Sequence, residues 1–326
     1  MDLHLAQTRF LAPTLNALSD AGMNSERLLR RAGLHTFRLY SPDAVVPVPT
    51  MLAMFDEIAR ESNGRGVPRE IAQAYRLHAI PGWGDALLAC PDVLATIRLA
   101  TAPQARIMSN NLVTAYLNGP QAIFETGYAA APSQAQEWVA VLSCLLVLDG
   151  FRSGCGPDWL PDEIDIAASD IGVLGDLFDL DRVIVRTNQP KTRIYFRSRD
   201  LAKRMVAHEI GASPDSPLPE TAMGQLYRLF DSLEPDARPT LDWAASRFDI
   251  SQRSFQRRLG AEGLTFRAVL DRWRMTKAIE LLEDPAIAVG HIAAQLHYSE
   301  ASHFIRAFHR WTGQSPTRYR DLGFSM

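Results

Sequence analysis

The sequence predicts two folded parts: an α+β N-terminal domain and an all-α C-terminal domain that contains two helix-turn-helix motifs. The chain has 326 residues, enough for two domains of ordinary size. The segment HEIGASPDSPLPE is rich in proline, serine and glycine and lacks apolar periodicity, and every apolar pattern after it has helical spacing. We therefore place an N-terminal domain at residues 1–207, a linker at 208–220 and a C-terminal domain at 221–326.

The composition is that of a soluble globular protein. Hydrophobic residues make up 47% of the chain and charged residues 22%, which excludes disordered and fibrous classes. The three cysteines, Cys90, Cys144 and Cys155, have no Cys-x-x-Cys spacing, so neither a disulfide framework nor a thiolate metal site is expected. The first ten residues carry charges where a signal peptide has its apolar core, and the longest apolar run ends at Asp149, too short for a membrane span. We expect a cytoplasmic protein without membrane contact.

The N-terminal domain mixes helical and strand-like patterns. Helices are expected within residues 55–62, 91–107 and 135–151, and strands within 112–117, 121–128, 163–168, 182–187 and 191–196. Asn118 and Gly119 separate two runs of alternating polarity and predict a β-hairpin turn.

The C-terminal domain shows only helical patterns. Helices are expected within residues 221–233, 239–248, 251–263, 265–284, 289–296 and 299–313, followed by a last short turn. Thr240 and Ser251 stand where helix N-caps are expected, and Gly263 and Pro285 stand where helices end.

Two of these helix pairs repeat at an offset of about 48 residues. Ala245 and Ala293 occupy equivalent places, each followed four residues later by a turn residue, Asp249 or His297. An apolar residue and a serine able to cap the next helix come directly after each turn, the second of these serines being Ser299. A small residue lets two helices cross closely, so the repeat predicts a duplicated helix-turn-helix.

The charge of the chain is unevenly distributed. Residues 1–220 contain 20 Lys and Arg against 25 Asp and Glu, whereas residues 221–326 contain 14 against 12, so the two parts carry −5 and +2 of the total of −3. Positive charge is concentrated between Arg253 and Lys277, a segment with seven basic residues that includes Arg272 and Arg274. A solvated helix face and a nucleic-acid contact are both consistent with this basic segment.

The segments RSFQRRL, EGLTFRAVLDRWRMTKAIELL and IAAQLHYSEASHFIRAFHRWTGQSPTRYR resemble the double helix-turn-helix domain of the AraC/XylS family of bacterial transcription regulators. FDEIARES, LACPDVLATIRLA and DWLPDEIDIAAS are similar to the N-terminal effector domain called arabinose-binding, found in the OruR- and VirS-like branch of that family. The family usually has glycine in both turns. Asp249 and His297 depart from this, but both residue types tolerate the left-handed backbone region.

The resemblance implies a sequence-specific DNA-binding regulator, such as an activator, with double-stranded DNA as its partner. Base contacts are expected from the first turn and outward face of each second helix. The expected DNA-binding residues are Ser251, Gln252, Arg253, Gln256 and Arg257 in the first motif and Ser299, Ala301, Ser302, His303 and Arg306 in the second. For the arginines, a base contact competes with a phosphate contact or a solvated charge.

No pattern of a catalytic or metal site is recognised. His291, His297, His303 and His309 are spaced six residues apart, so no two of them share one helical face as metal ligands require. No Gly-rich phosphate loop, nucleophile elbow or His-Glu-x-x-His pattern occurs. We expect neither an enzyme nor a bound cofactor.

Two hypotheses remain for the N-terminal domain: a small-molecule sensor, or a dimerisation or protein-interaction module without a small ligand. Trp83, Trp138, Trp159 and Tyr195 are candidate ligand contacts, although each is also a candidate core residue. Further candidate partners are a second copy of the chain and RNA polymerase. The apolar run at 138–151 is expected either to form an exposed helix that holds a homodimer or to be wholly buried in its own domain.

Overall fold

The computed structural model describes residues 3–41, 43–63, 66–103, 106–128, 133–205 and 218–322. The chain divides into two compact units. One, the C-terminal unit, comprises Met1–Leu3, Thr36–Arg38 and Pro219–Met326; the other, the N-terminal unit, comprises His4–His35 and Leu39–Leu218. Most of the predicted linker at 208–220 lies outside the described residues.

A five-stranded sheet organises the described part of the N-terminal unit, with the order β3-β4-β7-β5-β6. Its strands are β3 (Asn111–Asn118), β4 (Gln121–Tyr128), β5 (Glu163–Asp165), β6 (Ile184–Arg186) and β7 (Thr192–Arg197). All neighbouring pairs are antiparallel except β5 and β6, which are parallel. The short strands β1 (Leu5–Gln7) and β2 (Val45–Pro47) form a separate antiparallel pair. These strands confirm the predicted α+β class.

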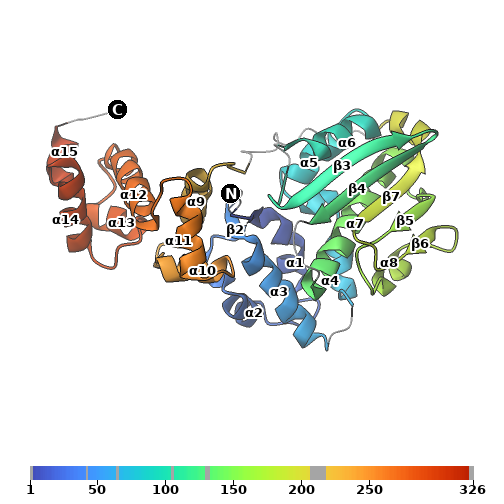
Figure 1. The fold of residues 1–326 in the computed structure, drawn as a ribbon, viewed down its shortest axis with the longest axis horizontal. Coiled ribbons are helices and arrows are strands. Elements are labelled where there is room, and N and C mark those ends of the chain that lie inside the picture. The colour runs from blue at the N-terminus through green and yellow to red at the C-terminus, as the bar shows by residue number, and fades with distance from the viewer. Residues whose placement is uncertain are drawn as a thin grey trace. The chain divides into compact units, whose positions relative to one another are not determined.

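Helices pack on one face of this sheet, as Figure 1 shows for α6 and α7. The helices of the unit are α1 (Ala12–Ala17), α2 (Ser25–Ala32), α3 (Val48–Glu61), α4 (Arg69–Ala74), α5 (Trp83–Leu88), α6 (Val93–Thr101), α7 (Gln134–Cys155) and α8 (Gly172–Leu177). The opposite face carries an alternating charge ladder. In it, Glu125 pairs with Arg193 at 2.6 Å and Asp165 pairs with Arg186 at 3.0 Å.

Of the two alternatives for residues 138–151, the structure shows burial within the N-terminal unit and not an exposed dimerisation helix. Helix α7 is longer than the apolar run and is apolar around most of its circumference, with Val141, Leu142 and Leu145 at most 1% exposed. Such a helix belongs in a core, because it has no face suited to water. Its length and composition would also allow it to cross a membrane, but most of it is buried within the unit.

The predicted β-hairpin is confirmed, with its turn shifted by one residue. Asn118 pairs with Gln121 as the last rung of the β3–β4 ladder, so the loop consists of Gly119 and Pro120. Gly119 has φ +61°. Glycine adopts this value without strain, which explains why it occupies the first central position of the turn.

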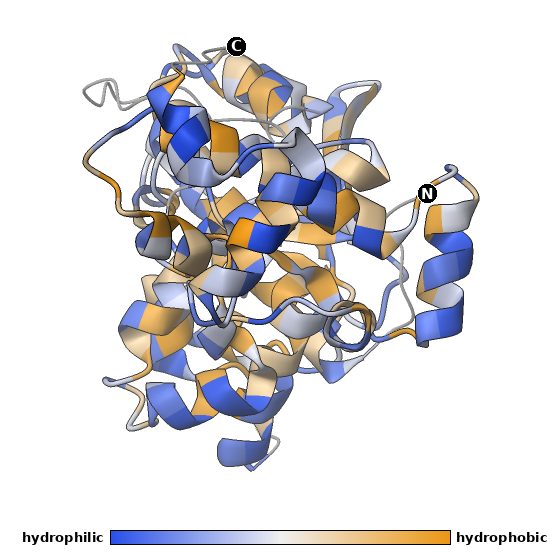
Figure 2. Cartoon of the chain, turned by 90° about the vertical axis from the view of Figure 1, so that its left-hand side faces the viewer, coloured by the Kyte–Doolittle hydropathy of each residue, from blue (hydrophilic) through white to orange (hydrophobic). Residues whose placement is uncertain are grey.

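The described part of the C-terminal unit is all-helical apart from an isolated bridge between Phe37 and Leu233. Its helices are α9 (Ala222–Asp231), α10 (Leu241–Arg247), α11 (Gln252–Gly260), α12 (Phe266–Leu282), α13 (Val289–Gln295), α14 (Ala301–Thr312) and α15 (Pro316–Asp321). The predicted caps Thr240 and Ser251 are confirmed, since their side chains accept from the amides of Trp243 and Ser254. Figure 2 shows hydrophilic and hydrophobic residues alternating along the helices of the chain.

Candidate nucleic-acid interface

Two helix pairs in the C-terminal unit have the same turn geometry. We call α10 with α11 the first helix-turn-helix unit and α13 with α14 the second. In the first, the amide of Ile250 donates to the carbonyl of Ala245 at 3.0 Å; in the second, the amide of Tyr298 donates to the carbonyl of Ala293 at 3.0 Å. Both bonds close the end of a helix in the Schellman manner. The duplication inferred from the sequence is therefore present in the hydrogen bonds of the backbone.

Both turns need a left-handed residue, and neither has glycine there. Asp249 has φ +52° and His297 has φ +62°. The expectation that these two residues would hold the turns is confirmed. Asp and His accept this conformation at lower cost than bulkier residues.

Helix α11 presents a polar face opposite its buried side. Phe255 and Leu259 are fully buried, whereas Arg253, Gln256 and Arg257 are exposed. Guanidinium groups and a carboxamide at these positions offer the donors that contact guanine and adenine edges in a major groove.

The start of α11 is fixed by side-chain hydrogen bonds. Ser251 caps the helix through the Ser254 amide at 3.2 Å, and Gln252 donates to the carboxylate of Asp242 in α10 at 2.8 Å. These two predicted site residues thus connect and orient the helices, while Arg253, Gln256 and Arg257 remain exposed.

Helix α14 has fewer charges at the corresponding face. Ser302, His303 and Arg306 are exposed and Ala301 is half-buried, while Phe304 is fully buried. Arg306 therefore faces away from the core, on the same side as the other candidate contacts of this helix.

Ser299 does not cap α14, contrary to the sequence expectation. The N-cap is Glu300, which makes no side-chain cap bond; its carboxylate accepts from the Ser302 hydroxyl at 3.2 Å. Helix α14 thus begins one residue later, relative to the repeat, than α11 does. Ser299 is exposed beside this helix start.

The basic segment is only partly a free cationic surface. Arg274 is half-buried, donates to the carbonyls of Leu296 at 2.9 Å and His297 at 3.2 Å, and lies 4.2 Å from the centre of the Tyr298 ring. It therefore braces the second turn. Lys277 pairs with Glu280 at 3.0 Å.

His297 has a structural role in the second turn. It is 2% exposed, stacks on Trp273 with ring centres 5.5 Å apart, and has its Nε2 atom 3.3 Å from the carbonyl oxygen of Phe230. Burial lowers the pKa of His297 to about 4, opposed by the hydrogen bond to Phe230 and assisted by the charge of Arg274. The ring is therefore neutral at pH 7.

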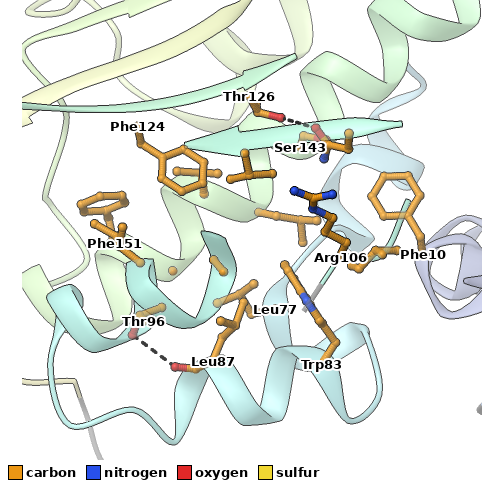
Figure 3. Close-up of a pocket in the computed structure, with 18 of the residues that line it drawn as sticks. Phe10, Leu77, Trp83, Leu87, Thr96, Arg106, Phe124, Thr126, Ser143 and Phe151 are labelled. Atoms are coloured by element: carbon orange, nitrogen blue, oxygen red, sulfur yellow. Dashed lines mark hydrogen bonds between the residues drawn. The ribbon is translucent and has the colours of Figure 1, made fainter. Parts of the chain in front are cut away.

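A cavity of about 100 Å³ lies within the N-terminal unit, between the sheet and helices α5, α6 and α7. Figure 3 shows Phe10, Trp83, Phe124 and Phe151 around it, with the guanidinium group of Arg106 pointing into it. Arg106 was not among the residues selected from the sequence. It is a lone arginine in a stretch without a recognised motif, and only the fold places it here.

Of the four aromatic residues named as candidate ligand contacts, only Trp83 lines this cavity. Trp138 is buried in the core at 4% exposure. Trp159 stacks on Phe151 with ring centres 4.6 Å apart, and the hydroxyl of Tyr195 donates to Asp165 at 2.7 Å.

Both parts of the chain match known families. Residues 244–321 match the family described as "Helix-turn-helix domain", and residues 22–205 match "Arabinose-binding domain of AraC transcription regulator, N-term". The second match covers more than half of the chain.

Curated relatives match over about a third of this chain. The HTH-type transcriptional regulator VqsM of Pseudomonas aeruginosa is 41% identical over 105 residues, which are 31% of this chain and 32% of the relative. VirS of Mycobacterium tuberculosis is 35% identical over 109 residues, 33% of this chain and 31% of the relative. The alignments thus span about a third of each of these relatives. The crystal structure of the transcriptional regulator CdpR from P. aeruginosa aligns over 95% of this chain and 96% of that chain, with 18% identity and a TM-score of 0.42.

Proposed function

The chain belongs to the AraC family of DNA-binding transcription regulators, and on this premise we propose that it binds a specific operator through α11 and α14 under the control of a small molecule bound by its N-terminal unit. The family consists of regulators rather than enzymes. Such a regulator acts in the cytoplasm, where RNA polymerase is a further candidate partner.

The observation that carries the DNA-binding part is the repeated turn. Two helix pairs close their turns with the same hydrogen bonds, at 3.0 Å each, and each second helix turns polar residues to solvent. Two such helices fixed on one support suit successive major grooves of a duplex, about 34 Å apart. Arg253, Gln256 and Arg257 are the proposed base contacts of α11. Ala301, Ser302, His303 and Arg306 are those of α14, with Ala301 offering only a methyl group to thymine. Ser251, Gln252 and Ser299 complete the proposed interface around the helix starts.

Selection from a random library of double-stranded DNA tests the proposal. The full-length chain should enrich one sequence, and its affinity for that sequence should exceed its affinity for unrelated DNA by about a thousandfold or more at 150 mM salt. Enrichment of no sequence above the background would overturn specific recognition.

The effector part rests on the cavity lined by Trp83, Phe124 and Arg106. Binding sites for small molecules are concave, mostly apolar and equipped with a few convergent polar groups. The cavity combines aromatic walls with Arg106, Asn111 and Thr126. A ligand that binds only the folded state raises the melting temperature, so a thermal-shift screen of the full chain against metabolites is the corresponding experiment.

An exposed edge strand favours a second candidate role, dimerisation through the N-terminal unit. Strand β3 is at the edge of the sheet, and its side chains Leu112, Tyr116 and Leu117 are 52%, 46% and 63% exposed. The strand contains no charged residue and no proline, the usual devices that prevent edge pairing. A second copy can pair with it antiparallel without like-charge repulsion, and a dimer would gain affinity at paired operator sites.

Light scattering of the full chain at micromolar concentration tests this role. We expect a dimer, and we expect Leu117→Lys to shift it towards monomer because a charge at the edge opposes strand pairing. Asn118→Lys is the matched control at the strand end. A monomeric wild type would remove dimerisation from the proposal.

A further inference from the structure

The side chains that line the cavity of the N-terminal unit indicate the chemical class of its ligand. Arg106 is the only charged side chain among the described residues that line it. Within the described parts of the chain, the Arg106 guanidinium group has neither an acidic partner nor a hydrogen bond. Arg106 is half-buried, and a guanidinium group that points into an apolar pocket without an acidic partner favours a bound anion.

Two hydroxyl groups that line the pocket already have hydrogen-bond partners within the protein. Thr96 donates to the carbonyl of Leu87 at 3.3 Å, and Ser143 is paired with the Tyr128 hydroxyl at 2.8 Å. Both hydroxyl groups are therefore occupied by the protein itself. Figure 3 shows Thr96 beside Leu87, away from the Arg106 guanidinium group.

Asn111 adds a second donor to the lining. Thr126 donates to its Oδ1 atom at 2.8 Å, which leaves the Nδ2 group without a recorded partner among the described residues. The pocket thus offers donors from Arg106 and Asn111, and a ligand must bring acceptors. An ionised carboxylate is acceptor-only and can take two parallel bonds from a guanidinium group.

The remainder of the lining determines the body of the ligand. It is aromatic and aliphatic, with Phe10, Trp83, Ile97, Phe124 and Phe151 among its residues. A pentose carries hydroxyl groups on most of its carbons, and these would find few partners here, although the family is described as arabinose-binding. An apolar cavity of about 150 Å³ holds benzene, so one of about 100 Å³ that is partly open to solvent encloses somewhat less than one aromatic ring and limits the body to a single ring or a short branched chain.

From these observations we propose that the effector is a small apolar monocarboxylate, with its carboxylate on Arg106 and Asn111 and its apolar body between the aromatic side chains. This inference rests on the proposed sensor function and specifies the chemical class of its ligand.

Isothermal titration of the full chain with four probes tests the class: benzoate, benzyl alcohol, benzylamine and L-arabinose. Benzoate should bind at least about tenfold more tightly than benzyl alcohol, because a charge-assisted pair is stronger than a neutral one. Benzylamine and L-arabinose should show no binding. Equal affinities for benzoate and benzyl alcohol, or no binding of benzoate, would overturn the inference.

Matched variants identify the residue. Arg106→Met should abolish the preference for benzoate over the alcohol, whereas Arg98→Met should keep it, since Arg98 is exposed on α6 outside the lining. Arg106→Glu should reverse the preference in favour of benzylamine. A preference for benzoate that survives in Arg106→Met contradicts the assignment.

A DNA-binding assay on the same preparations separates this inference from the proposed function. A chain that prefers benzoate through Arg106 but binds no DNA selectively supports the ligand class and overturns the regulator. If the chain binds its operator but has equal affinities for benzoate and benzyl alcohol, the regulator function is supported and the monocarboxylate class is overturned.

Discussion

In the first helix-turn-helix unit the turn residue Asp249 is exposed, whereas in the second the equivalent His297 is buried against Trp273. Arg274 donates to the carbonyls of the second turn. The same backbone turn is therefore an independent surface feature in one unit and part of the core in the other.

The solvent-exposed faces of the second helices, α11 and α14, also differ, and here the first unit has more residues able to contact DNA. Helix α11 exposes Arg253, Gln256 and Arg257, whereas α14 offers Ala301 and Ser302 at its start and Arg306 further along. Charge-assisted contacts to DNA are stronger than contacts from a methyl or hydroxyl group. We infer that the first unit contributes more to DNA affinity and the second more to the stability of the C-terminal unit.

The largest expected effect is acid destabilisation through His297. Its pKa is about 4 in the folded chain and about 6.5 in an unfolded one, so the unfolded state binds the extra proton between these values. Stability from the neutral ring is complete above pH 6.5 and is lost as the pH falls towards 4. Urea titrations at pH 7 and pH 4 should show a loss of about 3 kcal/mol attributable to this group.

Two histidine variants check the origin of that loss. His297→Asn should lower the free energy of unfolding at pH 7 but flatten its decline in acid, while the exposed His303→Asn should leave the decline unchanged. A decline that is the same in both variants would show that the buried ring is not its cause.

The next largest effect concerns Arg274. Its removal leaves two carbonyls of the second turn without their donor and removes the contact with Tyr298. Arg274→Ala should reduce the free energy of unfolding by about 2 to 3 kcal/mol. Arg272→Ala, an exposed arginine on the same helix, should change it by less than about 0.5 kcal/mol. Similar losses in the two variants would contradict the bracing role.

The third prediction addresses DNA affinity. Arg257→Ala should weaken operator binding by about 1 to 3 kcal/mol and relax the preference at one base pair, whereas Ser302→Ala in the second unit should cost less. Binding to operator and to random DNA is measured by fluorescence anisotropy. A fall by the same factor on both DNAs would make Arg257 a phosphate contact.

The smallest effect separates the two turns directly. Asp249→Gly relieves the left-handed backbone at an exposed position and should stabilise the chain by about 0.5 kcal/mol. His297→Gly relieves the same strain but deletes a buried ring, and should destabilise it. Thermal denaturation of both variants and the wild type gives the sign of each change in melting temperature. Changes of the same sign would mean that the two turns are equivalent.

Local features of the fold were predictable from the sequence. The caps Thr240 and Ser251, the turns at Asp249 and His297 and the β3–β4 hairpin depend on residues within a few positions of one another. Repetition at about 48 residues strengthened the helix-turn-helix prediction, because a chance match is unlikely to recur with the same spacing.

Long-range features were not predictable in the same way. Arg274 donates to carbonyls 22 and 23 residues away in the sequence. The run of basic residues around it therefore could not show that Arg274 stabilises the second turn. The cavity combines side chains from segments between Phe10 and Phe151, and no local pattern marks Arg106 as part of it. The burial of α7 depends on what the rest of the unit packs around it, which periodicity alone does not specify.

The central claim is that two unequal helices of one chain contact successive major grooves. Methylation protection of guanine N7 atoms, on the shortest operator that one protomer binds, tests it most directly. We predict two protected segments about ten base pairs apart on one face of the duplex, and we predict that Arg257→Ala exposes guanines in only one of them. A single protected groove, or equal loss of protection in both segments, would contradict the account.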